Sequence, residues 1–337
     1  MRVVITGGAG FIGSNLTSYF LEHGNEVVVF DNLSRPGTAI NANWLNSLHG
    51  KLRIVTADVH DYDALRSVVR GADAIYHLAA QVAVTASVAD PRLDFEVNAQ
   101  GTFNVLEAIR SECPSAFLAY SSTNKVYGAM EDWEVLKDRR RYIYAAHPEG
   151  VPEDRPLDFH SPYGCSKGTG DQYVRDYARI YGLNSVVFRQ ACIYGPHQFG
   201  NEDQGWVAHL VVQAAKGRPI TIYGDGFQVR DVLHVDDLVL CYARAIERSS
   251  AIRGQVFNVG GGPGSTLSLN ELVAYLESKF ERHLQYQFAD WRPGDQRVYI
   301  SNIRKAAEIL DWEPSIGVER GLDQLISWVA ENLYQIQ

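Results

Sequence analysis

The chain has 337 residues, of which 46% are hydrophobic and 21% are charged. A disordered chain cannot bury enough apolar surface to offset its chain entropy, so this composition indicates a folded globular protein. The net charge is −9, from 31 Lys and Arg against 40 Asp and Glu. Proteins that bind nucleic acid need clustered positive charge to replace counterions, so we do not expect a nucleic-acid partner.

Two further features argue against a membrane protein and against a disulfide scaffold. No run of about 18 apolar residues is present, so we expect no membrane span, and the apolar start of the chain is too short for a secretory signal. Cys113, Cys165, Cys192 and Cys241 are scattered and form no C-x-x-C pair. We therefore expect no disulfide framework, no metal site and a reduced, cytoplasmic location.

The first half of the chain alternates short β-branched runs with segments of helical periodicity. This alternation predicts an α/β fold, a Rossmann-type doubly wound parallel sheet with helices on both faces. Its strands read as continuous apolar runs, which is typical of strands buried on both faces. The expected strands are 3–5, 26–30, 52–55, 74–78, 116–120 and 186–189, and the expected helices are 13–23, 62–70, 98–111 and 162–181.

The alternation ends after Arg189, where the segment 195–204 is polar, aromatic and rich in turn residues. An average domain has about 150 residues, so the length indicates two. We predict a first domain over residues 1–190 and a smaller C-terminal α/β cap over residues 191–337, between which the chain can cross more than once. In the cap we expect a strand at 220–222 and helices at 207–216, 235–247, 269–280, 303–309 and 321–332.

Gly7, Gly10 and Gly13 form a G-x-x-G-x-x-G loop between the first expected strand and helix. Glycine permits the tight turn and the close approach of a pyrophosphate to the helix N-terminus. Asp31 ends the second strand, where its carboxylate can accept hydrogen bonds from a ribose diol and repel a 2′-phosphate. We therefore predict NAD as the cofactor. The alternative is that Arg35 accommodates the 2′-phosphate of NADP.

Tyr163 and Lys167 are four residues apart in the helix expected from Pro162, so they share one helix face. An ammonium near a phenol favours the phenolate and lowers its pKa, which makes the tyrosine a usable base for an alcohol proton. Thr123 follows an expected strand of the parallel sheet, at the edge where doubly wound folds bind ligands. Its hydroxyl can contact the reacting oxygen. The alternative for this hydroxyl run is a structural turn.

In this order, the motifs resemble those of the extended short-chain dehydrogenase/reductase family of NAD-dependent nucleotide-sugar epimerases and dehydratases. The resemblance covers nearly the whole chain and also includes His77 to Gln81 and Tyr194-Gly195-Pro196. It implies that Tyr163 is the base, that Thr123 is its partner hydroxyl and that Lys167 also holds the nicotinamide ribose. The residues assigned to the cofactor are Gly7, Gly10, Phe11, Ile12, Gly13, Asp31, Asn32, Ser34, Arg35, Asp58, Val59, Leu78, Ala79, Ala80, Gln81, Asn98, Ser121, Tyr163 and Lys167.

Within this family, three segments resemble the CDP-paratose 2-epimerase branch. They are Thr123-Asn124-Lys125, the long segment from Tyr127 to Tyr163, and the stretch from Asp203 to Val207. The long segment contains Trp133 and the basic run 139–141, for which the alternative is a solvated surface turn. We expect this insertion to enforce the sugar pose beside Thr123.

The resemblance implies that the cap holds a nucleotide-diphosphate sugar. Arg230 and Arg292 match positions that contact the diphosphate, and guanidinium groups suit bidentate phosphate contacts. Neither residue distinguishes cytosine from uracil. The residues assigned to the substrate are Gln81, Thr123, Asn124, Lys125, Gln190, Gln204, Gly205, Trp206, Val207, Tyr223, Arg230 and Arg292.

These assignments predict an NAD-dependent epimerase that oxidises and re-reduces C2 of CDP-paratose. The alternatives are a 4-epimerase of a UDP- or CDP-hexose and a non-catalytic NAD-sensing protein. A dehydratase needs an acid and a base after the threonine, where this chain has Asn124 and Lys125. The resemblance also implies a homodimer or homotetramer built on the helices that start near Asn98 and Pro162.

Overall fold

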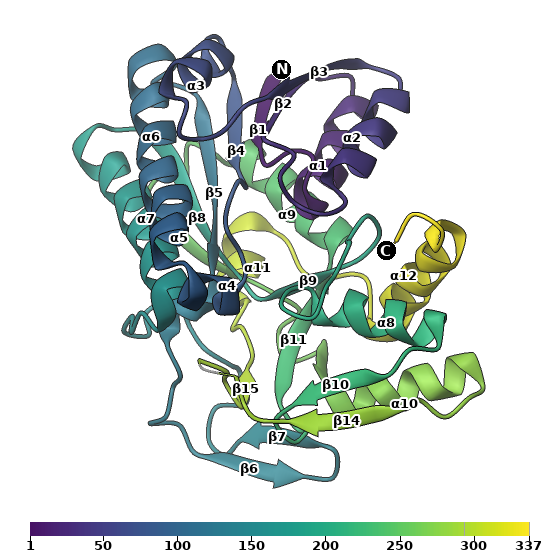
Figure 1. Ribbon diagram of the computed structural model, residues 1–337. Coiled ribbons are helices and arrows are strands. Elements are labelled where there is room, and N and C mark those ends of the chain that lie inside the picture. Colours follow the sequence, from purple (N-terminus) through teal and green to yellow (C-terminus); the bar gives the residue numbers. More distant parts are fainter. Residues whose placement is uncertain (293, 337) are drawn as a thin grey trace.

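A seven-stranded parallel sheet forms the centre of the fold (Figure 1), in the order β12-β8-β5-β4-β1-β2-β3. The computed structural model describes residues 1–292 and 294–336. The predicted Rossmann-type sheet is confirmed. Its strands are β1 (Arg2–Thr6), β2 (Glu26–Asp31), β3 (Lys51–Thr56), β4 (Ala74–His77), β5 (Phe117–Thr123), β8 (Asn184–Gln190) and β12 (Val256–Val259).

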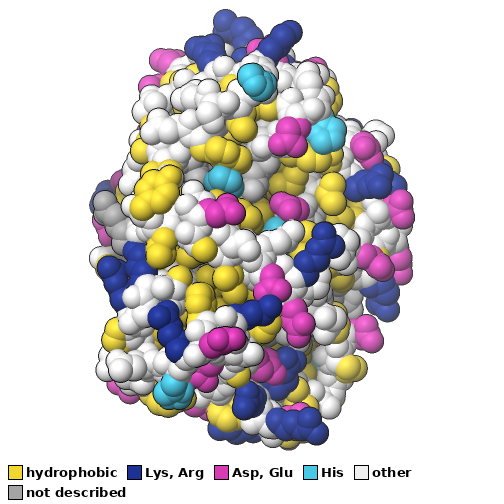
Figure 2. Space-filling model, turned by 90° about the vertical axis from the view of Figure 1, so that its right-hand side faces the viewer, with side chains coloured by type: hydrophobic (Ala, Val, Ile, Leu, Met, Phe, Trp, Pro, Cys, Tyr) yellow, Lys and Arg dark blue, Asp and Glu magenta, His cyan; other side chains and the backbone are white. Residues whose placement is uncertain are grey.

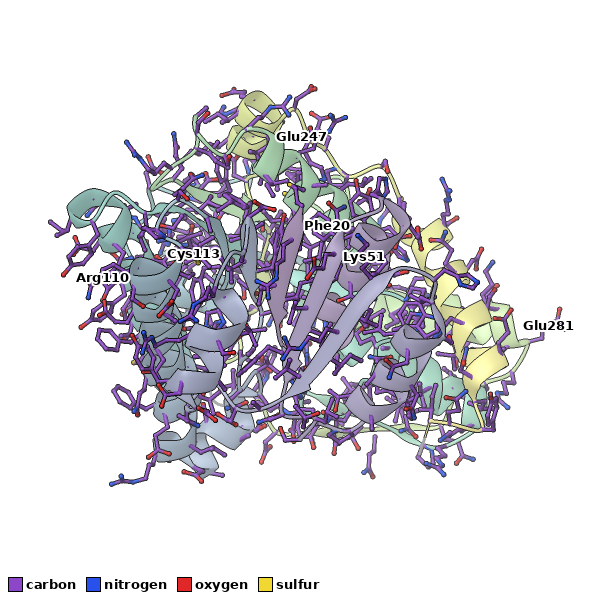
Figure 3. All side chains as sticks on the ribbon, turned by 90° about the horizontal axis from the view of Figure 1, so that it is seen from above. Phe20, Lys51, Arg110, Cys113, Glu247 and Glu281 are labelled. Carbon is purple, nitrogen blue, oxygen red and sulfur yellow. The ribbon has the colours of Figure 1, made fainter. Side chains whose placement is uncertain are left out.

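Side chains alternate between the two faces of this sheet and build a separate hydrophobic core on each. Ile5, Tyr76 and Ala119 lie in register across β1, β4 and β5 and belong to one core. Their neighbours in the chain point to the other face and belong to the second core. The first core is covered by α1 (Phe11–Glu22), α2 (Thr38–Ser47), α9 (Val235–Glu247) and α11 (Arg304–Leu310), the second by α3 (Tyr62–Val69), α6 (Gly101–Glu112) and α7 (Ser161–Ile180). Figure 3 shows both layers, with Glu247 at the end of α9 and Arg110 on α6.

The cap has its own core, built from three helices and short strands. A division of the chain at residue 190 stays a prediction, because β12, α9 and α11 come from beyond that residue and complete the large sheet and its cover. The cap helices are α8 (Trp206–Lys216), α10 (Leu269–Phe280) and α12 (Val318–Asn332). In its sheets β11 (Val229–His234) pairs with β9 (Cys192–Tyr194), β13 (Thr266–Ser268) and β15 (Val298–Tyr299), and β10 (Ile220–Tyr223) pairs with β14 (Tyr286–Ala289).

The helix predicted over 98–111 begins differently. It starts with a π-helical turn, η1 (Glu96–Gln100), before α6 continues it. Two short helices precede it that the sequence did not predict, α4 (Val84–Ala89) and α5 (Pro91–Phe95). Both pack against α7, so their form depends on tertiary contacts more than on local periodicity.

The long segment between Tyr127 and Tyr163 contains a hairpin of β6 (Val135–Asp138) and β7 (Arg141–Tyr144). Arg139 and Arg140 are exposed at its turn, as the surface-turn alternative expects. Arg141 instead donates to both carboxylate oxygens of Glu271, each at 2.6 Å. The hairpin therefore packs on the cap, near the lower end of the molecule in Figure 1.

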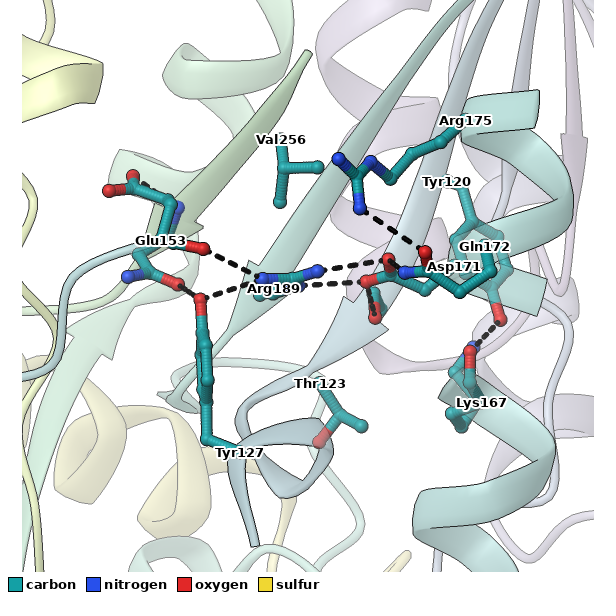
Figure 4. A network of polar contacts seen from close by, with 12 residues as sticks. Tyr120, Thr123, Tyr127, Glu153, Lys167, Asp171, Gln172, Arg175, Arg189 and Val256 are labelled. Carbon is teal, nitrogen blue, oxygen red and sulfur yellow. Dashed lines mark hydrogen bonds and ion pairs between the residues drawn. The ribbon is translucent and has the colours of Figure 1, made fainter. Parts of the chain in front are cut away.

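A buried ion pair joins α7 to β8 (Figure 4). Nε and Nη2 of Arg189 lie 2.9 and 3.1 Å from the carboxylate oxygens of Asp171, and the two side chains are 2% and 0% exposed. Ser122 of β5 donates to the same carboxylate at 2.9 Å. Arg189 also donates to the Tyr127 hydroxyl at 3.0 Å. One carboxylate thus fixes a helix against two strands.

The surface carries mixed charge. In Figure 2, basic and acidic side chains are interspersed over one face of the molecule, with apolar side chains between them. Across the part of the chain that the structure describes, no helix has the length and hydropathy needed to cross a bilayer. Within the same residues, no cluster of three or more His, Cys, Asp or Glu side chains is arranged to hold a metal ion.

Candidate active site

A cavity of about 1070 Å³ lies between the carboxyl ends of the large sheet and the cap. Ligands bind at this edge of doubly wound sheets. Its walls come from the glycine loop, from the ends of β2, β4, β5 and β8, from α7, and from the cap around β10 and β11. The cavity is therefore large enough for two connected ligands.

The glycine loop leaves no room for side chains. Gly7 has a φ of +69°, and a Cβ there would lie 2.7 Å from the backbone nitrogen of Ala79. A Cβ on Gly13 would lie 2.2 Å from the carbonyl oxygen of Gly7. Gly10 is the N-cap of α1 and provides no capping side chain. The backbone N–H groups at the start of α1 thus face the cavity and are suited to an anion.

Asp31 is held in place by the backbone and is 7% exposed. Its carboxylate accepts hydrogen bonds from the N–H of Ala9 at 3.0 Å and of Leu33 at 2.8 Å. Burial raises the pKa of this carboxyl, while the backbone hydrogen bonds oppose the rise. Each carboxylate oxygen keeps a lone pair for a ribose hydroxyl. The Arg35 guanidinium reaches the cap and donates to Gln204 at 2.5 Å, so this contact does not support the NADP alternative.

The structure places all but one of the predicted cofactor residues along the cavity. The exception is Asn98, which is 1% exposed. Its side chain contacts Gln81, Asp94 and Ser166, so it acts behind the wall. The residues that line the cavity are Gly7, Gly10, Phe11, Ile12, Gly13, Asp31, Asn32, Ser34, Arg35, Asp58, Val59, Leu78, Ala79, Ala80, Gln81, Ser121, Tyr163 and Lys167. A glycine cradle, an open helix N-terminus and an acidic residue fit a dinucleotide.

Tyr163 and Lys167 come from successive turns of α7, and Thr123 ends β5; all three line the cavity. Burial raises the pKa of Tyr163 to about 12, while a hydrogen bond with Thr123 and the charge of Arg35 act to lower it. From the sequence, the Lys167 ammonium is expected to lower this pKa, but the net shift is upward, because loss of hydration outweighs the nearby charges. Positive charge near the Tyr163 hydroxyl acts to lower this pKa and favours the phenolate.

Lys167 is almost fully buried, and its ammonium lies 4.4 Å from the centre of the Tyr120 ring. Burial lowers the pKa of Lys167 to about 7, and the charges of Asp94 and Asp171 act to raise it. His77 lies nearby between the hydroxyls of Thr6 and Thr102, at 2.7 and 3.0 Å. Burial lowers the pKa of His77 to about 3, so it is neutral and adds no charge beside the lysine.

The cap side of the cavity carries three cations. Lys125 donates to the carbonyl of Gly294 at 3.1 Å, and burial lowers its pKa to about 8. Arg230 lies 3.5 Å from the Asp295 carboxylate. The Arg292 guanidinium lies 3.7 Å from the centre of the Tyr223 ring. These groups lie on different segments and face one space, which suits a diphosphate.

All but one of the predicted substrate residues line this cavity. The exception is Val207, which is 1% exposed and belongs to the cap core. The residues that line it are Gln81, Thr123, Asn124, Lys125, Gln190, Gln204, Gly205, Trp206, Tyr223, Arg230 and Arg292. Several polar lining residues were not predicted, among them Asn41, His197, Gln198, His209, Gln228 and Asp295. Of these residues, only Gln228 and Asp295 could have been found from the sequence, since each lies within three residues of an arginine predicted to bind the substrate.

Among the described residues, the long segment does not itself form part of the cavity wall. Residues 128–160 are absent from the part of the cavity wall that the structure describes. The hairpin instead contacts the loop after β10, where Tyr142 donates to Asp225 at 2.6 Å and Lys137 lies 3.6 Å from the centre of the Phe227 ring. The hairpin can therefore influence the substrate through the cap, whereas the end of the segment contacts η2, where the N–H of Asp158 donates to the carbonyl of Val126 at 3.0 Å.

Comparison with known proteins agrees with this geometry. Residues 3–260 match the model of the NAD dependent epimerase/dehydratase family. The chain belongs to that family. It is 44% identical over 337 residues to the CDP-paratose 2-epimerase of Salmonella typhi, covering 98% of this chain and 99% of the relative.

Two solved structures of the family are also similar. One is the UDP-glucose 4-epimerase of Thermotoga maritima with UDP-glucose, with a TM-score of 0.84 and 31% identity over 99% of this chain and 100% of that one. The other is the UDP-glucuronic acid 4-epimerase of Bacillus cereus with UDP-glucuronic acid and NAD, with a TM-score of 0.86 and 28% identity over 98% and 99%. The chain is thus an NAD-dependent enzyme of the epimerase/dehydratase family.

Replacement of Tyr163 by Phe tests the site. The ring still packs, but the proton acceptor is lost, so we expect turnover to fall by about 10²–10⁴-fold while the NAD content stays unchanged. Product formation and the NAD released on denaturation measure the two effects. Tyr181→Phe is the control, because Tyr181 follows the same helix and is 53% exposed. Retention of more than about a tenth of the activity by Tyr163→Phe contradicts the role of general base.

Proposed function

We propose that the chain converts CDP-paratose to CDP-tyvelose by oxidation and re-reduction at C2. The observation that carries the proposal is the identity of 44%, over 98% of this chain, to a CDP-paratose 2-epimerase. It is supported by the grouping of Tyr163, Thr123 and Lys167 in a cavity that also contains the glycine loop. The same residues suit other nucleotide sugars, so the substrate rests on the relative.

The side chains of the chain can move the proton of the sugar hydroxyl. When bound, NAD⁺ supplies a hydride acceptor and a positive charge. Tyr163 takes the hydroxyl proton as the carbon loses its hydride, which leaves a flat ketone. When hydride returns to the opposite face of that carbon, Tyr163 gives the proton back to the oxygen. Thr123 contacts the same oxygen, and its hydrogen bond to Tyr163 favours the phenolate, while Lys167 lines the same cavity one helical turn away. The ketone must turn over in the cavity between the two steps, and the substrate undergoes no net oxidation.

We assign the diphosphate to Arg230 and Arg292, with Lys125 as a third cation. In the structure the two arginines form long ion pairs, at 3.5 Å with Asp295 and at 3.6 Å with Asp203, and Arg292 also donates to the carbonyl of Glu202 at 2.7 Å. Weak pairs of this kind can be exchanged for phosphate oxygens at small cost. An anchored diphosphate fixes one end of the substrate, and the sugar pose then decides which carbon reacts.

Two alternatives remain for the reaction. A 4-epimerase of a UDP- or CDP-hexose would use the same proton acceptor, and a relative with that activity on UDP-glucose, from Mycolicibacterium smegmatis, is 33% identical. A non-catalytic NAD-sensing protein has no need for Tyr163, Thr123 and Lys167 in one cavity. The presence of all three therefore favours an enzyme.

We also propose that the chain forms a homo-oligomer through α6 and α7. Phe103 and Tyr173 are 41% and 46% exposed, and their ring centres lie 6.0 Å apart on these two helices. Large exposed aromatic side chains that lie side by side are typical of protein interfaces. Sedimentation equilibrium tests this assignment, and a mass that stays near 37.6 kDa at all concentrations rejects it.

A panel of nucleotide sugars tests the reaction. We expect the purified protein to convert CDP-paratose without added NAD, because the cofactor is regenerated, and NMR to show inversion at C2 alone. CDP-glucose and UDP-glucose serve as comparisons. Inversion at C4 of either would support the 4-epimerase instead. A protein that contains NAD but converts none of the sugars would support the non-catalytic alternative.

A further inference from the structure

Asp94 is a buried carboxylate that the proposed reaction does not use. It lies in α5, is 0% exposed and does not line the cavity. Its Oδ2 accepts a hydrogen bond from the Ser166 hydroxyl at 2.5 Å. Its Oδ1 accepts from the side-chain amides of Gln81 and Asn98, both at 3.0 Å. A buried carboxylate is costly unless its charge is compensated, so this position needs a physical explanation.

The contacts of Asp94 join the cavity wall to the catalytic helix. Ser166 lies on α7 between Tyr163 and Lys167, and its hydroxyl oxygen lies 3.2 Å from the carbonyl oxygen of Tyr163. Gln81 lines the cavity, and its backbone exchanges hydrogen bonds of 2.9 Å with the side chain of Asn98. A shift of Asp94 would therefore move both the Gln81 wall and the turn of α7 that carries the base.

Lys167 is the cation whose charge compensates Asp94. No Lys, Arg or His of the described residues lies within 4.0 Å of this carboxylate, so it has no direct ion pair. Burial raises the pKa of Asp94, and among nearby charges that of Lys167 lowers it. In return, Asp94 raises the pKa of Lys167 and also that of Tyr163. The effect of one charge on both catalytic groups can be measured.

We propose that Asp94 is a positioning residue that keeps Lys167 as an ammonium and fixes the catalytic turn of α7 against the Gln81 wall. The proposal goes beyond the reaction proposed above and rests on it only for the assay. Asp171 is the second anion near Lys167, but Arg189 neutralises it directly. Asp94 has no such partner and is therefore the effective counter-charge.

The other titratable groups around Lys167 are already accounted for. They come from every layer packed against α7. His77 of β4 is neutral, and Tyr120 of β5 donates to the carbonyl of Lys167 at 3.2 Å. The remaining charged or titratable groups on the elements packed against α7 are Arg92 of α5, Glu96 of η1, Glu107, Arg110 and Glu112 of α6, Lys125 and Tyr127 of η2 (Asn124–Tyr127), and Arg189 of β8, together with Tyr163, Cys165, Asp171, Tyr173, Arg175, Asp176, Tyr177 and Arg179 on α7 itself.

Asp94→Asn tests the charge, because the amide keeps the shape and the acceptor for Gln81 and Asn98. Loss of a negative charge lowers the pKa of Tyr163 and of Lys167 alike. The two limbs of the kcat profile report these two pKa values, so both limbs move to lower pH. We expect a shift of about one pH unit, the order of one charge at an effective dielectric constant of ~20.

Two control variants separate charge from structure. Asp90→Asn removes the same charge four residues earlier in the chain. Asp90 is an exposed N-cap, a position to which Asn is equally suited, so both limbs of the kcat profile should stay in place. Ser166→Ala removes the hydrogen bond to Asp94 but keeps the carboxylate, so kcat should fall without a shift of the limbs. A fall of kcat in Asp94→Asn at every pH with unmoved limbs would overturn the proposal and leave Asp94 a structural role.

The kcat profile is measured with whichever nucleotide sugar the unmodified protein converts. If the proposed substrate is wrong, the unmodified protein fails to convert CDP-paratose. If the role of Asp94 is wrong, the variant fails to shift the profile. Circular dichroism and NAD content establish that each variant is folded. If Asp94→Asn does not fold, Asp94→Ser is compared instead. If only Asp94→Glu folds, the charge is required for folding itself, and the positioning role is rejected.

Discussion

The buried ion pair between Asp171 and Arg189 is the constraint on which the site depends. Taking two charges out of water is costly, and removal of one partner from such a pair costs about 3–5 kcal/mol, because the other charge stays buried and unpaired. The pair therefore fixes the position of α7 along β5 and β8, because both charges stay paired only when these three elements keep their observed alignment. The residues of this ion-pair network lie next to residues of the site. Ser122 precedes Thr123, Arg189 precedes Gln190, and Asp171 lies one helical turn after Lys167. Figure 4 shows this arrangement around Thr123 and Lys167.

Burial of the site has a second consequence, which is electrostatic. It moves the pKa of Tyr163 up to about 12 and that of Lys167 down to about 7, so each group tends toward its neutral form. In a medium of low dielectric constant, nearby charges act more strongly than in water. The protonation state of the site is therefore sensitive to a few charges: Arg35 and Asp94 in the chain, and the cofactor when it is bound.

The sequence predicted the elements whose signals are local. The glycine loop, six of the seven strands of the large sheet, and α9 and α10 were found from apolar runs and periodicity, and the positions of Tyr163 and Lys167 follow from helical spacing; β12 was not predicted. The strands β9, β11 and β15 were not found, because they pair with segments far away in the chain. The same holds for Asp94, whose role arises only when α5 packs on α7.

Two predicted site residues, Asn98 and Val207, lie behind the cavity wall for a geometric reason. Trp206 and Val207 are consecutive in α8, so their side chains point about 100° apart, and only Trp206 faces the cavity. Asn98 matches the family pattern, but its amide is used by Gln81 and Asp94 behind the wall. The pKa of Tyr163 could not be deduced from a charge four residues away, because its direction depends on burial.

Transfer of hydride from and back to C2 is the central claim, and the fate of a C2 deuterium label tests it most directly. With CDP-paratose deuterated at C2, the label should stay at C2 in the product, since the same cofactor molecule returns it, and turnover should slow if hydride transfer limits the rate. Loss of the label to water would contradict hydride return and indicate enolisation. Inversion at C4 with C2 untouched would contradict the assignment of the carbon.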